Sequence, residues 1–338
     1  MSDSPAPLAD PELATPWLHR LAVACVWVAL VPIVFGALTT TQGAGMAVPD
    51  YPQTFGQNMF TYNMFGTGVT WDVFLEHTHR LGGSLIGLLC LAFFGMVMIV
   101  EDRRWMRVVG TLVLLGVISQ GLLGGVRVLR NMTALAMTHG FTAALFFALL
   151  CFAAIATGRG WGQPPRLTLD RGTTDARLRI ARNATLAAAG FLAVQYLLGG
   201  LLRHFNIAAV VHVVFAAVAW IALMAAAVAG IMTGVARVRR VGWMLAVAAC
   251  LQVALGLWAY VVRYGAGLEI ARDGSAAQVI SRTSHMVVGV LLVAATASLI
   301  TQVLRTQTLL APRPSSPADG ATRVRGIEPV RTREEVLA

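Results

Sequence analysis

Residues 79–100 read HRLGGSLIGLLCLAFFGMVMIV, in which one histidine and one arginine precede a run of apolar and small residues. A helix needs roughly 20 consecutive, predominantly apolar residues to cross the hydrocarbon core of a bilayer. Inside a bilayer the backbone must satisfy its own hydrogen bonds, and a helix does so within one segment. This stretch therefore predicts a membrane-spanning helix.

Seven further runs of similar length and composition occur along the chain. The eight predicted spans are approximately residues 21–42, 79–100, 106–126, 134–157, 180–202, 207–234, 241–262 and 281–304. Only 12% of the 338 residues are charged, whereas a soluble domain carries about 25%. The sequence predicts an all-α, polytopic membrane protein with eight transmembrane helices arranged as two tandem four-helix bundles.

The net charge of +10 indicates membrane topology rather than nucleic-acid binding. All 26 basic residues are arginine, and 19 of them lie in the terminal segments and in the loops after the even-numbered spans. Basic segments favour the cytoplasmic side, so we expect both termini there. The proline-rich, slightly acidic start of the chain resembles neither a signal nor a transit peptide, which favours a bacterial inner (plasma) membrane over an organelle.

These features divide the chain into five parts. They are a cytoplasmic N-terminal segment (1–20), an N-terminal four-helix half (21–157), a cytoplasmic linker (158–182), a C-terminal four-helix half (183–304) and a cytoplasmic tail (305–338). The tail has too little apolar content to pack, which predicts disorder. The four cysteines all lie inside predicted spans, so we expect no disulfide.

The odd-numbered spans carry an internal repeat. It reads Gln120-x-x-x-Gly124, Gln195-x-x-x-Gly199 and Gln252-x-x-x-Gly256, with Pro32-x-x-x-Gly36 in the first span. The glycines have two interpretations, close packing of helix backbones or a role at a site. The glutamines are polar at membrane depth, which favours a specific hydrogen bond.

Four histidines occupy equivalent positions near the start of the even-numbered spans: His79, His139, His212 and His285. Each is followed four residues later by glycine or alanine, which shares its helix face and leaves a flat surface beside the imidazole. Ionisable residues in spanning segments mark functional sites. The pattern predicts axial ligands of two haems near the outer face, bound by His79 with His139 and by His212 with His285. The alternative for any one histidine is a helix-end residue bonded to a neighbour. The histidines not assigned to haem are His19, His77 and His204.

Glu76, His79 and Arg80 occupy positions i, i+3 and i+4, so one helix face carries all three. The carboxylate could orient the imidazole or accept a proton at the haem edge. Arg80 could pair with a haem propionate or with the carboxylate of Glu76, and a plain Glu–Arg ion pair is the simplest alternative. The other three histidines lack an equivalent carboxylate, so the N-terminal half is the better candidate for chemistry.

The Glu-x-x-His-Arg motif, the single histidines of later spans and the segment GALTTTQGAGMAVPDYP (36–52) together resemble the haem A synthase family of cytochrome oxidase assembly enzymes. The resemblance covers residues 21–304. It implies oxidation of the C8 methyl of haem O to a formyl group by successive hydroxylations, giving haem A. It also implies a haem b cofactor held by His212 and His285, and a substrate haem held by His79 and His139 near a catalytic Glu76.

The resemblance implies partners as well: haem O synthase, cytochrome oxidase subunit I and an electron acceptor of unknown identity. Many members of the family carry a cysteine pair in the outer loops, which this chain lacks. Two other functions remain open from the residues alone. One is a non-catalytic haem-binding cytochrome or haem carrier, and the other is a transporter whose histidines coincide with the pattern by chance.

Overall fold

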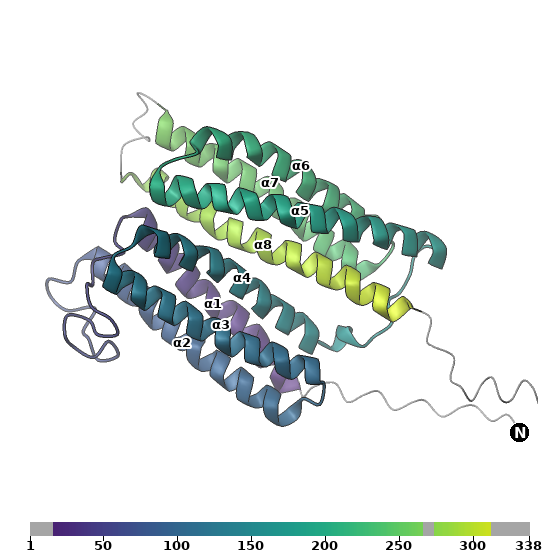
Figure 1. Ribbon diagram of the computed structural model, residues 1–338, viewed down its shortest axis with the longest axis horizontal. Coiled ribbons are helices and arrows are strands. Elements are labelled where there is room, and N and C mark those ends of the chain that lie inside the picture. Colours follow the sequence, from purple (N-terminus) through teal and green to yellow (C-terminus); the bar gives the residue numbers. More distant parts are fainter. Residues whose placement is uncertain (1–15, 266–273, 312–338) are drawn as a thin grey trace, which may run out of the picture.

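Each half of the chain folds into four antiparallel helices, and the two groups lie side by side (Figure 1). The computed structural model describes residues 16–265 and 274–311. Across these residues the regular structure is helical, without β-strands, and eight helices are long and apolar enough to cross a membrane. The predicted all-α, polytopic membrane fold is confirmed.

The helices are α1 (Pro16–Thr41), α2 (Trp71–Val100), α3 (Arg104–Arg130), α4 (Thr133–Thr157), the short 3-10 helix η1 (Arg159–Trp161), α5 (Arg171–Phe205), α6 (Ala209–Ile231), α7 (Ala236–Tyr264) and α8 (Ala276–Leu310). The predicted segment 1–20 is described only from Pro16, and residues 312–338 of the predicted tail lie outside the described residues.

Three helices begin well before the predicted spans because their starts are set by capping residues. The side chains of Thr70, Asp170 and Ser275 each accept a hydrogen bond from the backbone N–H three residues later, at the start of α2, α5 and α8. Such a bond satisfies an N–H that has no partner within the helix. The apolar run marks only the part of a helix that matches the bilayer. Helix α5 therefore starts inside the segment predicted as linker, and α8 continues to Leu310 in the predicted tail.

The two groups of helices each have an apolar core. One core is built from α1, α2, α3 and α4 with Val290 and Ala294 of α8, and the other from α5, α6, α7 and α8. Helix α8 thus contributes to both cores, and it packs against α4 and α1 of the first group. Polar contacts also join the groups, since Arg203 of α5 donates to the carbonyl of Ala37 in α1 at 2.9 Å.

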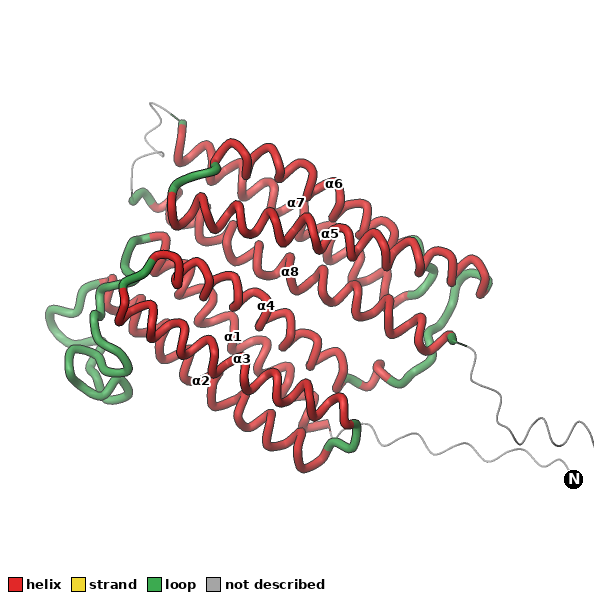
Figure 2. The backbone as a smooth tube through the Cα atoms, viewed as in Figure 1, coloured by secondary structure: helices red, strands yellow, loops and turns green. Residues whose placement is uncertain are grey.

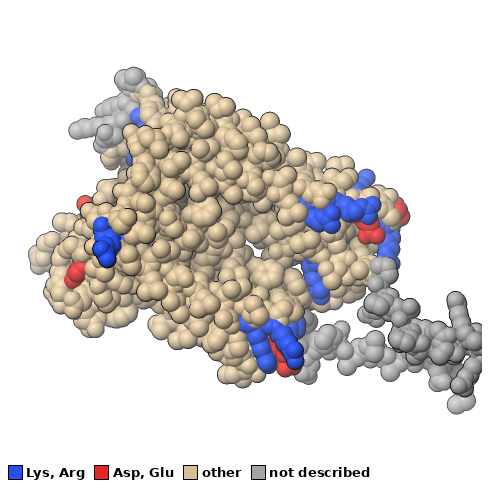
Figure 3. Space-filling view, viewed as in Figure 1, with Lys and Arg blue, Asp and Glu red and all other residues tan. Residues whose placement is uncertain are grey.

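The two ends of the bundle differ in character. The four histidines predicted as ligands lie at the end that carries the long loop 42–70, which is coiled over α1 and α2 (Figure 2). Arginines gather at the opposite end, where α1 begins and α8 ends (Figure 3). The chain is a multi-pass membrane protein by its helices. The side of the membrane to which each end belongs stays a prediction.

Candidate functional site

The structure brings the four predicted histidine ligands together as two pairs. The ring centres of His79 (α2) and His139 (α4) lie 6.2 Å apart, and their planes are 87° apart. His212 (α6) and His285 (α8) repeat this arrangement, with ring centres 6.4 Å apart and planes 88° apart. The pairing is the one that the sequence predicted, although all four residues are far apart in the chain.

This spacing suits two imidazoles that bind one metal ion from opposite sides. With each nitrogen about 2 Å from the metal, the ring centres are roughly 6 Å apart. A metal ion bound by protein alone needs more ligands than two, and the described residues contain no group of three or more histidine, cysteine, aspartate or glutamate side chains that could hold one. Haem iron takes only its axial ligands from the protein. Each pair could therefore hold a haem.

A glycine of the neighbouring odd-numbered helix lies beneath each imidazole. A Cβ added to Gly36, Gly124, Gly199 or Gly256 would lie 2.8, 3.4, 3.1 or 2.9 Å from the Cε1 atom of His79, His139, His212 or His285, respectively. Distances under 3.0 Å are essentially never seen for a real Cβ. The glycines of the internal repeat are thus the surfaces against which the histidine rings pack. The repeat was visible in the sequence, but its contact with the histidines was not.

At three of the four histidines, the residue four positions before the glycine lies near the same imidazole. His79 Nδ1 donates to the carbonyl of Pro32 at 2.7 Å, and His285 Nδ1 donates to the carbonyl of Gln252 at 3.2 Å. For His79 such a bond fixes the ring orientation and leaves Nε2 for a metal. In His285, by contrast, Nε2 lies 3.4 Å from the side-chain Nε2 of Gln252. His212 Nδ1 instead lies 3.1 Å from Nε2 of Gln195. The glutamines predicted to make specific hydrogen bonds do so at the second pair.

In the first pair, His139 has no such hydrogen bond from the residue four positions before its glycine. Gln120 donates to Thr142 Oγ1 at 2.7 Å instead of contacting His139. The Nδ1 atom of His139 is buried without a hydrogen-bond partner. The His139 ring is therefore the least constrained of the four by polar contacts. Gly83, four residues after His79, has nothing within 4 Å of an added Cβ, so the surface beside this pair is open.

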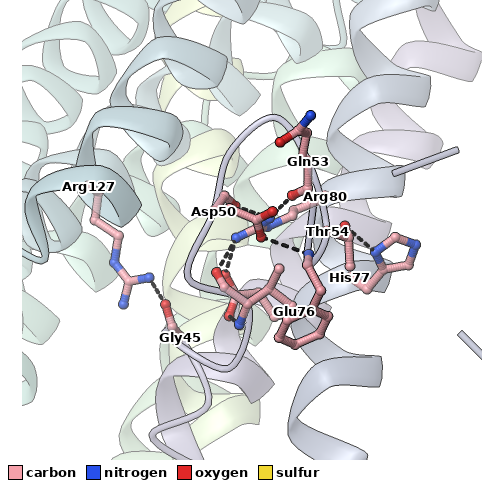
Figure 4. A network of polar contacts seen from close by, with 10 residues as sticks. Gly45, Asp50, Gln53, Thr54, Glu76, His77, Arg80 and Arg127 are labelled. Atoms are coloured by element: carbon pink, nitrogen blue, oxygen red, sulfur yellow. Dashed lines mark hydrogen bonds and ion pairs between the residues drawn. The ribbon is translucent and has the colours of Figure 1, made fainter. Parts of the chain in front are cut away.

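Glu76 and Arg80 form a buried ion pair on α2 (Figure 4). Glu76 lies three residues before His79 in the chain, and Arg80 follows it directly. Glu76 accepts from Arg80 Nη2 at 2.7 Å and from the backbone N–H of Val48 at 3.0 Å. Arg80 also donates to the carbonyls of Val48, Asp50 and Gln53, at 2.7 to 3.0 Å. The carboxylate is the observed partner of Arg80, and the guanidinium further attaches the loop 42–70 to α2. A propionate contact of Arg80 stays a prediction.

The loop itself is organised around Asp50. Its carboxylate accepts from the backbone N–H groups of Phe55 and Gly56 at 2.9 and 2.7 Å. Slight burial raises the pKa of Asp50, but these two bonds and the charge of Arg80 outweigh it, so the pKa lies below its ordinary value. Arg127 of α3 donates to the carbonyl of Gly45 (Figure 4). The loop is thus attached to both α2 and α3 at the end of the bundle that holds the first histidine pair.

The other histidines take different places. His77 is fully buried on the loop side of α2, where Nδ1 lies 3.2 Å from Thr54 Oγ1 and the ring packs against Tyr62. His19 lies at the opposite end of the bundle, 3.3 Å from Thr157 Oγ1. His204 is near the end of α5. None of the three joins the two pairs.

The fold and these pairs define a multi-pass membrane protein with two imidazole-lined sites at one end. Residues 19–211 match the family model COX15-CtaA, described as cytochrome oxidase assembly protein. Because the match covers more than half of the chain, the protein belongs to this family of cytochrome oxidase assembly proteins. None of the curated proteins compared with the chain matches it. The family match includes Glu76, His79 and His139 and ends just before His212.

Proposed function

We propose that this protein is a haem A synthase, which oxidises the C8 methyl of haem O to a formyl group for cytochrome oxidase assembly. The family membership supports the assembly role. The observation that carries the specific reaction is the asymmetry between two otherwise similar sites. Both have perpendicular imidazoles on glycine surfaces, but in the part of the chain that the structure describes only the first has a buried carboxylate, Glu76, within one helix turn of its histidine.

In this proposal the substrate haem O lies between His79 and His139, and a haem b cofactor lies between His212 and His285. When bound, haem b supplies one-electron redox chemistry. The protein's own residues hold and orient the macrocycles. Pro32 and Gln252 fix two imidazoles through their carbonyls, and Arg80 and Arg127 attach the loop 42–70 at this end of the first half.

Glu76 is the catalytic residue of the proposal. Oxidation of a methyl group releases protons as well as electrons, so it needs a base close to the reacting edge. The carboxylate is buried, and its two oxygens are positioned by Arg80 and by the Val48 N–H. The electron acceptor, haem O synthase and cytochrome oxidase subunit I remain predicted partners.

Substitution Glu76→Gln tests the proposal, because glutamine keeps the shape of the side chain but cannot serve as the base. We expect purified Glu76→Gln protein, supplied with haem O and an electron acceptor, to form less than about a hundredth of the wild-type formyl haem, as expected for loss of a general base. Chromatography of the extracted pigments measures the product, and the absorption spectrum checks that haem is still bound.

Glu101→Gln is the matched control. Glu101 is also a buried carboxylate paired with an arginine, at 2.6 Å from Arg103, but it lies at the opposite end of α2. We expect this variant to make haem A at close to the wild-type rate. Normal haem A formation by Glu76→Gln would show that the carboxylate is not the base in this reaction. A wild-type protein that binds haem O but never converts it would instead be a haem carrier or an electron-transfer cytochrome.

A further inference from the structure

A cavity of about 350 Å³ lies between the two halves at the arginine-rich end, far from the histidine pairs. Its walls come from the start of α1, the end of α4, η1, the start of α7 and the end of α8. The side chains that matter are those of His19, Trp161, Arg237, Gln302 and Arg305. On the face seen in Figure 3, the surface is hollowed between the halves.

Two arginines from different helices give this cavity its charge. Arg237 donates through Nη1 to the carbonyl of Gly160 at 3.0 Å, while its Nη2 is buried without a hydrogen-bond partner. Arg305 donates through Nε to the carbonyl of Trp161 at 2.8 Å and stacks on that indole, with its Cζ 4.7 Å from the ring centre. These backbone contacts hold both guanidinium groups at fixed positions on the cavity wall.

No acidic side chain neutralises this charge in the part of the chain that the structure describes. The ion pairs found there involve Arg80, Arg103 and Arg107, and neither Arg237 nor Arg305 has a carboxylate partner. A buried guanidinium N–H without a partner is costly. An anion in the cavity would compensate the charge of Arg237 and Arg305, both of which line it.

We propose that the cavity binds the phosphate group of an anionic phospholipid. Guanidinium groups are well shaped for phosphate oxygens, and basic pockets between transmembrane helices bind lipid head groups. The other walls are formed by Ala154, Ile155, Trp161 and the backbone of Gly158 and Gly160, which suit the apolar part of a lipid. The cavity lies at the ends of spanning helices, where head groups lie. The lipid would bridge the two halves, contacting α7 and α8 of one and α4 of the other.

The test compares the wild-type chain with Arg237→Gln, Arg305→Gln and the double variant, all purified in the same detergent. Native mass spectrometry counts bound phosphatidylglycerol, phosphatidylcholine and inorganic phosphate over a titration of each. We expect wild-type protein to bind phosphatidylglycerol in preference to phosphatidylcholine, and each single variant to bind it about tenfold more weakly, as loss of a charge-assisted hydrogen bond predicts. Arg239→Gln is the control, because Arg239 is on the same helix turn but exposed.

Three results would overturn the proposal. Equal binding of phosphatidylglycerol by wild type and both single variants would show that the lipid sits elsewhere. Equal binding of the two phospholipids would show that the net negative charge of the head group is not recognised. Saturation by inorganic phosphate that displaces the lipid would make the site one for free phosphate. Circular dichroism checks that every variant keeps its helices, and the single variants decide the question where the double variant does not fold.

Discussion

At the scale of single residues, the sites depend on the absence of a side chain. Each imidazole packs on a glycine of an adjacent helix, and at His79 and His285 the ring comes closer to the backbone than a Cβ would permit. Glycine within a helix destabilises it by about 0.5–1 kcal/mol relative to alanine. Here the glycine allows the histidine ring to pack directly against the neighbouring helix. Gly36 beneath His79 and Gly256 beneath His285 are the tightest of the four contacts.

Gly36→Ala should therefore displace the His79 ring, although alanine is the better helix former. We expect this variant to lose the haem bound in the N-terminal half and to keep that of the C-terminal half, measured as haem per protein by pyridine haemochrome absorbance. Gly87→Ala in α2 is the control, because an added Cβ there meets nothing within 4 Å. Unchanged haem content in Gly36→Ala would mean that the ring tolerates movement or does not bind haem.

At the scale of elements, α2 does more than cross the membrane. Its first turns carry His79, which pairs with His139. They also carry Glu76, His77 and Arg80, which contact the loop 42–70 (Figure 4). The loop is long for a connection between two helices, yet its backbone is held at several carbonyls by buried donors. The position of Glu76 is therefore coupled to the order of this loop.

The loop should lose order in acid. Because the pKa of Asp50 is below its ordinary value in the folded protein, the carboxylate stabilises the loop at pH above the unfolded pKa of about 3.9, and this contribution is lost as the pH falls through the folded pKa. We expect hydrogen exchange of residues 50–56 to accelerate below about pH 4, beyond the intrinsic effect of pH. Asp50→Asn should exchange fast at neutral pH already. Asp72→Asn is the control, because the Asp72 side chain is exposed at the start of α2, and its exchange should match that of the wild type. Slow exchange in Asp50→Asn at neutral pH would show that the Asp50 carboxylate does not order the loop.

At the scale of the whole molecule, the two halves repeat one architecture and differ in chemistry. The histidine pairs have nearly the same geometry, while the carboxylate, the long loop and the unpartnered His139 Nδ1 belong to the first half. The halves meet along α8, α4 and α1, and Arg203 reaches from one to the other. Under the proposed function, the C-terminal half holds a permanent cofactor while the N-terminal half exchanges substrate and product.

Removing one ligand from each half should separate these roles. Under the proposed function, wild-type protein keeps haem b through purification. We then expect His285→Ala to lose this haem b, and His139→Ala to keep it while failing to retain haem O. Extraction and chromatography of the pigments distinguish the two haems. Loss of both pigments in both variants would show that the halves do not bind haem independently.

The membrane-spanning helices and the four histidines were predictable from the sequence for physical reasons. A bilayer requires long apolar helices with internally satisfied backbones, so length and composition alone predicted eight spans. The histidines stood out because ionisable residues are rare at that depth. Capping residues, which set the starts of α2, α5 and α8, were overlooked because hydropathy does not register them.

The sequence by itself determined the number of spans, their order and the helix faces that carry Glu76 and the four histidines, because these depend on local composition and helix periodicity. Only the tertiary structure decided which imidazoles face each other at 6.2 and 6.4 Å, which glycine lies beneath each ring and which carbonyls Arg80 holds. Those contacts join residues that are distant along the chain, and they exist only once the helices have packed against one another.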